Sequence, residues 1–381
     1  MKIEIEPRTS LLLGERKCNI TIGESNFETP APAVTNTDIY YVNQIMDATL
    51  SKMAFKNKVL EIRKNLFNKT LENVLLSPKG QKKFGGWIDQ QISMAKSSSL
   101  VSLSLFTPTL QYVTVNEKVV TELVNLQLRT KLDVVNIPDI RYIAVEKMAE
   151  IIKKESERIK KKGKEPFYLI PMDQDYQVFS QKVEAAKPFI SGITALYADI
   201  GTFFPNFDVL RSLVADKNII RVLSRVNRYS DSDKPSVLFP LSFLCADIYS
   251  VEYGFPASSD LTEKQRIAKE IRTAKRFDVK TFEYYTVQLH DEKLGKFLNC
   301  GCPICEGRTI DDIPIDFIGS LTAAFRIHET FVIHDLISSC LDSYEIVKTF
   351  AFLKDDMTIR KAMKNTFLSD LMTTQTMLPT I

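Results

Sequence analysis

The residues best suited to chemistry lie in a short cysteine-rich segment late in the chain. Three of the six cysteines, Cys300, Cys302 and Cys305, are separated by one and two residues. Thiolates at these separations can converge on one ion, because the Gly and Pro between them favour a tight turn. A tetrahedral zinc needs a fourth ligand, and two of the three histidines, His328 and His334, follow the cluster. Since three thiolates and one imidazole leave no open position on the ion, the pattern predicts a structural Zn²⁺ site.

The alternative for these cysteines is three ordinary thiols near a turn. Crowding of this kind suits a metal better than a disulfide framework, because the thiols of a cytosolic protein are kept reduced. The remaining cysteines, Cys18, Cys245 and Cys340, are isolated in the sequence and are expected to be small apolar core residues.

The middle of the chain alternates between strand-like and helix-like segments. β-rich runs lie at 132–137, 167–172 and 190–196, with one or two more within 237–251. Helical patterns lie at 119–129, 143–162, 207–214 and 261–276. Strands alternating with helices predict a parallel sheet. Because the chain has no glycine-rich phosphate-binding turn, we favour a closed TIM (β/α)8 barrel with a zinc-binding insertion over an open doubly wound sheet.

The chemistry of a barrel lies where its strands end, so polar residues that follow predicted strands are candidates for the reacting site. These residues are Asp139, Asp173, Gln174, Asp199 and Asp247. Each could also cap a helix or form a turn. The segment 315–371 is predicted to be mostly helical and to pack on the barrel, since its apolar residues are three and four positions apart.

Charge and hydropathy exclude several classes of protein. With 50 Lys and Arg against 47 Asp and Glu, the net charge of +3 excludes a histone-like polycation. The longest nearly apolar run, 237–246, is about half of what a bilayer-spanning helix needs, and the first residues do not form a secretion signal. We therefore expect a cytoplasmic protein with no membrane contact.

Two sets of basic residues could contact nucleic acid locally. The first consists of Lys153, Lys154, Arg158, Lys160, Lys161, Lys162 and Lys164, and the second of Arg266, Lys269, Arg272 and Arg276. Phosphate binding needs such surfaces, but a solvated helix face has the same composition. Glu155, Glu157 and Glu165 interleave the first set and favour the solvated face there.

The cysteine segment, followed after 22 residues by His328, resembles the zinc motif of the tRNA-guanine transglycosylase superfamily, with the archaeal branch closest in spacing. Residues 27–37 (FETPAPAVTNT) resemble its early "ETPAFMPV-x-T" segment. Gln127 leading to Asp133 and Asp139 resembles its "Q…DI-x-M-x-x-D" strand. The spacing of the family motif selects His328 over His334 as the fourth ligand.

The resemblance implies a zinc-containing barrel that exchanges a purine base in nucleic acid. In that family an aspartate attacks the anomeric carbon, guanine leaves, and a 7-deazaguanine takes its place on the covalent glycosyl-enzyme. Asp139 matches the aspartate that holds the guanine-like edge, and Gln174 lies near the family's base-contacting glutamine. The segment 246–250 resembles the nucleophile strand "D-M-F-D", but the attacking position falls on Ser250.

These departures leave two readings open. One is a divergent transglycosylase that acts on DNA, or on tRNA, with Asp247 as nucleophile and Asp89 as the proton-handling group. The other is a zinc-containing subunit that has lost catalysis and binds nucleic acid or an active partner, with a homodimer as a further arrangement. In either case we expect a barrel over 1–280, a zinc-binding subdomain over 281–345 and a helical tail over 346–381 that packs on the barrel.

Overall fold

The computed structural model describes most of the first 227 residues and selected positions after them. The described residues are 1–5, 16–29, 31–36, 39, 59–68, 71, 77–97, 103–110, 113–198, 200–227, 246–252, 262, 265, 275–278, 283–286, 302, 304, 305, 321, 324, 325, 328, 329, 331 and 332. Every structural statement below concerns these residues.

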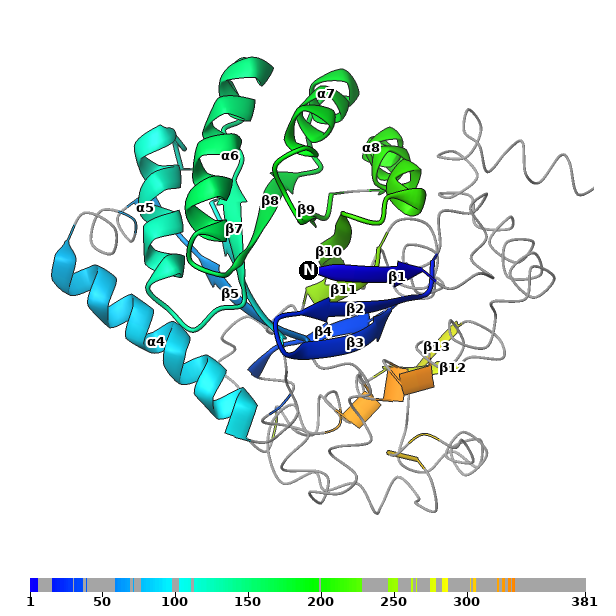
Figure 1. Cartoon of the computed structure of the whole chain (residues 1–381). Coiled ribbons are helices and arrows are strands. Elements are labelled where there is room, and N and C mark those ends of the chain that lie inside the picture. The colour runs from blue at the N-terminus through cyan, green and yellow to red at the C-terminus, as the bar shows by residue number, and fades with distance from the viewer. Residues whose placement is uncertain are drawn as a thin grey trace, which may run out of the picture.

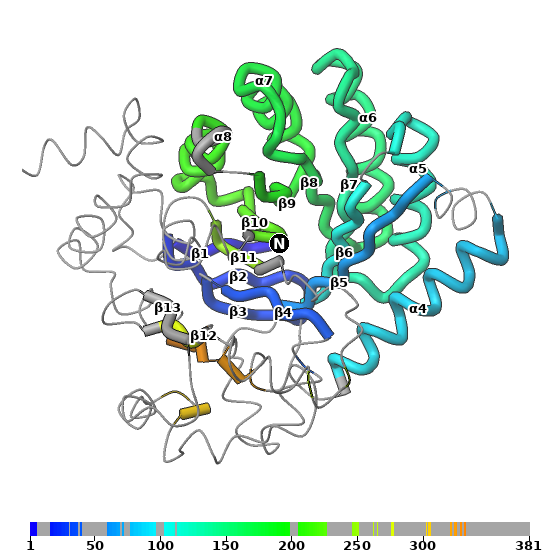
Figure 2. Tube along the Cα trace, turned by 180° about the vertical axis from the view of Figure 1, so that it is seen from behind, coloured from blue at the N-terminus to red at the C-terminus, as the bar shows by residue number. Residues whose placement is uncertain are grey.

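Eight parallel strands form the centre of the molecule. In chain order they are β4 (Ala31–Val34), β5 (Val59–Asn65), β6 (Leu103–Thr109), β7 (Val134–Pro138), β8 (Glu165–Pro171), β9 (Gly192–Leu196), β10 (Ile220–Asn227) and β11 (Ile248–Glu252). Their order in the sheet is β6-β5-β4-β11-β10-β9-β8-β7, so β11 returns to pair with β4. This is the strand order of a TIM barrel, and Figures 1 and 2 show the strands surrounding a common axis from the two sides.

The barrel is nearly closed at the seam between β6 and β7, where side chains supplement the backbone. The Asp133 Oδ2 atom accepts hydrogen bonds from both the backbone N–H and the hydroxyl of Ser104, each at 2.8 Å. Further along the seam, the Asn136 amide donates to the Phe106 carbonyl at 2.7 Å. These bonds satisfy polar groups that would otherwise remain unpaired along the two strand edges.

Five α-helices follow successive strands and form an outer layer over this part of the barrel (Figure 1). They are α4 (Pro78–Ser97), α5 (Glu117–Leu128), α6 (Val145–Lys160), α7 (Tyr176–Ala186) and α8 (Ile200–Ser212), the last continued by the short 3-10 helix η1 (Leu213–Ala215). Local sequence signals begin several of them. Asn116 and Asp175 accept hydrogen bonds from the first-turn N–H groups of α5 and α7, and Pro78 occupies the first position of α4.

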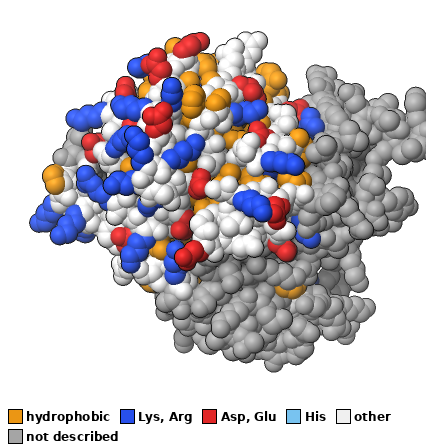
Figure 3. Space-filling model, viewed as in Figure 1, with side chains coloured by type: hydrophobic (Ala, Val, Ile, Leu, Met, Phe, Trp, Pro, Cys, Tyr) orange, Lys and Arg blue, Asp and Glu red, His pale blue; other side chains and the backbone are white. Residues whose placement is uncertain are grey.

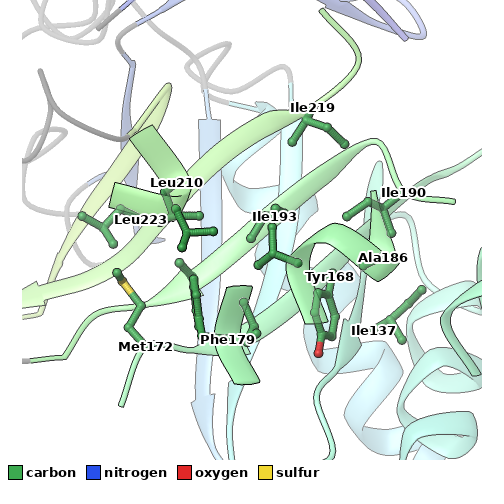
Figure 4. Close-up of a cluster of buried hydrophobic side chains, with 14 of the residues drawn as sticks. Ile137, Tyr168, Met172, Phe179, Ala186, Ile190, Ile193, Leu210, Ile219 and Leu223 are labelled. Atoms are coloured by element: carbon green, nitrogen blue, oxygen red, sulfur yellow. The ribbon is translucent and has the colours of Figure 1, made fainter. Parts of the chain in front are cut away.

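The outer hydrophobic core fills the space between the strands and these helices. Figure 4 shows part of it, with Ile137, Tyr168 and Ile193 of the strands against Phe179 of α7 and Leu210 of α8. All five side chains are buried.

A small antiparallel sheet packs at the N-terminal end of the barrel. Its strands are β1 (Lys2–Ile5), β2 (Cys18–Ile22) and β3 (Ser25–Thr29). Their apolar side chains share one core with residues at the starts of the barrel strands, among them Phe167 and Ile220. At this end a Cβ on Gly192 would lie 2.6 Å from the Phe167 ring, so the glycine allows the aromatic ring to fill the barrel.

The barrel predicted from the sequence is confirmed, but several of its strands were not predicted. The strands predicted at 132–137, 167–172 and 190–196 correspond to β7, β8 and β9, whereas β4, β5, β6, β10 and the N-terminal sheet were not predicted. The helix predicted over 261–276 is wrong at its end, because residues 275 and 276 belong to strand β12 (Lys275–Asp278), which pairs with β13 (Glu283–Thr286). None of the described helices has the length and apolar character needed to span a membrane.

Candidate metal centre and barrel interior

Three buried side chains converge on one point and form a candidate metal centre. The Sγ atoms of Cys302 and Cys305 lie 3.2 and 3.5 Å from Nδ1 of His328, and all three ligand atoms are within 4.8 Å of one another. The Cys305 N–H donates to the Cys302 carbonyl at 3.0 Å, which closes the turn that places both sulfurs on one side. Two thiolates and an imidazole at this separation can hold a metal ion.

The surroundings of the cluster prepare the imidazole for coordination. Nε2 of His328 lies 2.8 Å from the Phe277 carbonyl oxygen, so it carries the proton and leaves the Nδ1 lone pair directed at the sulfurs. The Arg276 guanidinium donates to Sγ of Cys305 at 3.4 Å, and its positive charge offsets the negative charge of a thiolate site. Metal-ligating histidines usually have such a second hydrogen bond, which neither the cysteine spacing nor the histidine spacing reveals.

The metal centre shares a hydrophobic core with the barrel. Cys302, Ile304 and Cys305 belong to the same buried cluster as Ile88 and Ile92 of α4. The helical residues Leu321, Ala324 and Phe325 are buried in this cluster too, and His328 is helical and buried, as the spacing predicted. The remaining predicted cysteine ligand, Cys300, and the alternative histidine, His334, lie outside the described residues, as do Asp199 and the tail over 346–381.

Asp247 lies at the N-terminal end of the barrel rather than at the reacting end. It precedes β11, and its carboxylate is held by Arg16 (Nε–Oδ1 2.8 Å, Nη2–Oδ2 2.7 Å) and Arg221 (Nη2–Oδ1 3.0 Å). The Arg221 backbone N–H donates to it as well, at 2.8 Å. All three side chains are fully buried. Burial would raise the pKa of the Asp247 carboxyl, but the two guanidinium charges and their hydrogen bonds lower it far below its ordinary value.

Asp89 also faces the N-terminal end, from the outer layer of the barrel. It lies on α4, and its Oδ1 atom accepts a hydrogen bond from the backbone N–H of Lys131, just before β7, at 2.7 Å. The structure therefore does not bring Asp247 and Asp89 together at the C-terminal ends of the strands. The sequence placed Asp247 near a strand end, but the strand begins after it.

Asp139 and Gln174 do lie together, at the C-terminal ends of β7 and β8. Nε2 of Gln174 donates to Asp139 at 2.9 Å, and the Tyr168 hydroxyl donates to it at 2.6 Å. Both Asp139 oxygens also pair with the buried ammonium of Lys182, at 2.9 and 3.0 Å. Burial and the neighbouring Asp139 raise the pKa of Tyr168 well above its ordinary value, so its hydroxyl keeps its proton. In this arrangement Asp139 is one half of a buried ion pair, and its role in binding a base stays a prediction.

A third buried carboxylate, which was not predicted from the sequence, lies inside the barrel. Glu61 of β5 accepts hydrogen bonds from Nε of Arg63, at 2.7 Å, and from the Ser224 hydroxyl of β10. Ser250 of β11 also hydrogen-bonds to it. The signal for this group was one acidic residue within the apolar run at the start of β5 (VLEIRKN). An acidic residue at an inward position of a strand must have partners or a function.

The basic sets have different environments. In the first set Arg158 pairs with Glu155, Lys154 pairs with Glu117, and the Lys164 ammonium donates to the Leu132 carbonyl. Figure 3 shows Lys and Arg interspersed with Asp and Glu over the helical face. Of the second set the structure describes the side chain of Arg276 alone, which is buried beside Cys305 and not on the surface.

Comparisons with known proteins add little to this geometry. No protein-family model and no curated protein matches the sequence. Among solved structures, a proposed fructose-1,6-biphosphate aldolase from Coccidioides immitis has 12% identity and a TM-score of 0.39, over 82% of this chain and 91% of that one. The YdjI aldolase from Escherichia coli K12 has 11% identity and a TM-score of 0.34, over 79% and 97%.

The tryptophan synthase A-subunit from Pyrococcus furiosus is similar at 15% identity and a TM-score of 0.31, over 59% of this chain and 86% of that one. Likenesses this low carry no argument about activity. The class of the protein, a TIM barrel with a candidate Cys/His metal centre, follows from its own strand order and side-chain geometry.

Proposed function

We propose that the chain is a zinc-containing transglycosylase that exchanges guanine for a 7-deazaguanine base in nucleic acid, with DNA favoured over tRNA as the polymer. The observation that carries the proposal is the convergence of Cys302, Cys305 and His328. These residues were selected from the sequence by their resemblance to the zinc motif of the tRNA-guanine transglycosylase superfamily. The eight-stranded barrel is the second point of agreement with that superfamily.

The metal in this proposal is Zn²⁺ with a structural role. Thiolate and imidazole ligands suit zinc, and Cys300 completes a closed four-ligand set in the proposal. The site shares its core with α4, so the ion would connect the late segment of the chain to the barrel. It would contribute folding energy and would not take part in the reaction.

Metal analysis tests the zinc site directly. Protein purified without chelator should contain about one zinc per chain. His328→Ala and Cys302→Ala should lower the zinc content and the midpoint of thermal unfolding together. Cys18→Ala is the matched control, because Cys18 is buried away from the cluster in the core of the N-terminal sheet. A zinc content clearly below one per chain in the wild-type protein would overturn the zinc assignment.

An incorporation assay tests the reaction. Labelled guanine or 7-deazaguanine is incubated with zinc-loaded protein and with duplex DNA or unmodified tRNA in parallel. The proposal expects label in at least one polymer, with more label in DNA than in tRNA. A base must leave its stack to react, so single-stranded DNA serves as a third substrate that removes this cost. Label in none of the three polymers would overturn the proposed activity.

The alternative function, a binding subunit without catalysis, has its own supporting observation. Ser250 stands where the resemblance places the attacking aspartate, and the nearby Asp247 is enclosed by Arg16 and Arg221. In this alternative the chain binds nucleic acid or an active partner, and a homodimer is one form of such a partner. Retention of labelled DNA or tRNA on the protein, with no base exchange, is the outcome that would favour it.

A further inference from the structure

The interior of the barrel changes from apolar to polar along its axis. Near the N-terminal ends of the strands the inward residues are apolar, and they join the core of the β1–β3 sheet. One step further toward the C-terminal ends, three inward positions are Glu61, Ser224 and Ser250, on β5, β10 and β11. Aliphatic side chains usually fill a TIM barrel throughout, and buried polar groups cost stability. A polar layer at this depth therefore needs a reason other than packing.

Glu61 is the charged centre of this layer. Its side chain is fully buried, whereas the paired Arg63 is 12% exposed. Residues two apart on a strand share a face, so Arg63 lies on the same face as Glu61 and nearer the C-terminal end of the barrel, here called the mouth. Burial would raise the pKa of the Glu61 carboxyl, but the Arg63 charge and hydroxyl hydrogen bonds, including those from Ser224 and Ser250, lower it below its ordinary value. The group is an ionised acceptor at neutral pH and has no proton to donate.

The wall beside Glu61 contains a strained residue. Arg225 of β10 has a φ of +63°, in the left-handed region that side chains with a Cβ rarely adopt, and the pairing of β10 with β11 shifts register at this point. Its backbone N–H donates to the Ser250 hydroxyl at 3.1 Å, and its guanidinium donates to Asn65 at the end of β5 at 3.0 Å. Strain of this kind is often found at functional sites. Here the strained backbone directs the Arg225 N–H at Ser250 and the Arg225 guanidinium at the end of β5.

We propose that Glu61 is the carboxylate that attacks the anomeric carbon of the target nucleotide, with Arg63 and Arg225 facing the phosphates on either side of it. This inference rests on the proposed function. The other carboxylates that the sequence singled out are committed elsewhere: Asp247 to two arginines, Asp139 to Lys182, and Asp89 to a backbone N–H outside the barrel. Ser250, at the expected nucleophile position, hydrogen-bonds to Glu61, so the carboxylate reaches the same place from another strand.

The reaction balances with water and the incoming base as the only other participants. A Glu61 oxygen forms a bond to C1′ of the sugar while the C1′–N9 bond of the guanosine breaks. Guanine leaves with the electron pair of that bond and takes a proton from a water molecule at the mouth. The incoming base then gives its ring N–H proton to the resulting hydroxide and attacks C1′, which releases Glu61 as a carboxylate. Two displacements at one carbon retain the configuration of the sugar.

Peptide mapping of the wild-type protein is the first test. The protein is incubated with the polymer that takes up label, without an incoming base, and is then quenched in acid and digested with protease and nuclease. The peptide containing Glu61 should carry the added mass of a sugar residue. An adduct on another carboxylate, in protein that incorporates label, overturns this inference and leaves the proposed function standing. Absence of label from every polymer overturns the proposed function, and this inference with it.

Glu61→Gln is the second test, with Glu155→Gln as its matched control. Glu155 also has a fully buried side chain, pairs with an arginine (Arg158) and accepts a hydroxyl hydrogen bond (Thr121), but it lies between α5 and α6. Glu61→Gln should lower incorporation by about 10³-fold or more, with normal zinc content and polymer binding. Glu155→Gln should keep incorporation within roughly threefold of wild type, since it does not touch the reacting site. Equal losses in the two variants would overturn the inference, and if Glu61→Gln does not fold, the adduct position decides.

Discussion

Asp247 and Glu61 are both fully buried carboxylates of the barrel, and both have a pKa below the ordinary value, but their partners differ. Asp247 lies at the N-terminal end of β11 and is held by two fully buried guanidinium groups and a backbone N–H. Glu61 lies inside β5 and is held by serine hydroxyls and by one arginine that is 12% exposed. The partners of Asp247 are as buried as the carboxylate itself, whereas Arg63 beside the buried Glu61 is partly exposed.

The difference separates a carboxylate that stabilises the fold from one that can exchange partners. The Arg16 guanidinium also donates to the Val214 carbonyl, at 3.2 Å, and thereby fixes the segment before β2 to the 3-10 helix η1. Releasing Asp247 would leave two cations in a low-dielectric environment, at a large cost. A serine hydroxyl can rotate to another acceptor, and an arginine near the mouth can turn to a phosphate, so releasing Glu61 costs less.

Replacing Asp247 should have the largest effect on stability. Asp247→Asn removes the charge that balances Arg16 and Arg221 and should lower the free energy of unfolding by about 3–5 kcal/mol, measured by denaturant titration. Asp89→Asn is the control, because Asp89 accepts one hydrogen bond at an exposed site, and it should change stability by less than about 1 kcal/mol. Similar losses in the two variants would contradict the structural role of Asp247.

The sequence could predict three side chains of the candidate metal centre and the class of the barrel, but not the role of each carboxylate. The cysteine spacing predicted that Cys302 and Cys305 lie close together, and the resemblance to the family motif selected His328, which does lie beside them. The function of Asp247 depends on which end of β11 it occupies and on Arg16, 231 residues earlier in the chain. Neither follows from local pattern, because strand register and long-range partners are set by tertiary packing.

Acidification should destabilise the protein through both carboxylates. Their folded-state pKa values are lowered, so the stabilisation is present above the unfolded-state pKa of about 4 and is lost as the pH falls toward the folded-state values. Asp247 should remove up to about 1.4 kcal/mol per pH unit below that point, or about 2 kcal/mol between pH 4 and pH 2.5, and Glu61 should act in the same direction. Denaturant titrations of the wild-type protein and Asp247→Asn over this range measure the slope. Loss of Asp247 should flatten it, and an unchanged slope would argue against the ionised pair.

The smallest expected effect on the free energy of unfolding comes from the backbone strain at Arg225. It tests whether the region around Glu61 is less stable than an unstrained backbone would make it. Arg225→Gly and Arg225→Ala both remove the guanidinium, but alanine retains the Cβ that disfavours a φ of +63°. The glycine variant should therefore be more stable than the alanine variant by about 1 kcal/mol in denaturant titrations. Both variants should bind nucleic acid more weakly, because each loses a cation at the mouth. If alanine proved as stable as glycine, the backbone at this position would not be strained. The contrast between Asp247 and Glu61, which are both fully buried, would then rest on their different partners alone.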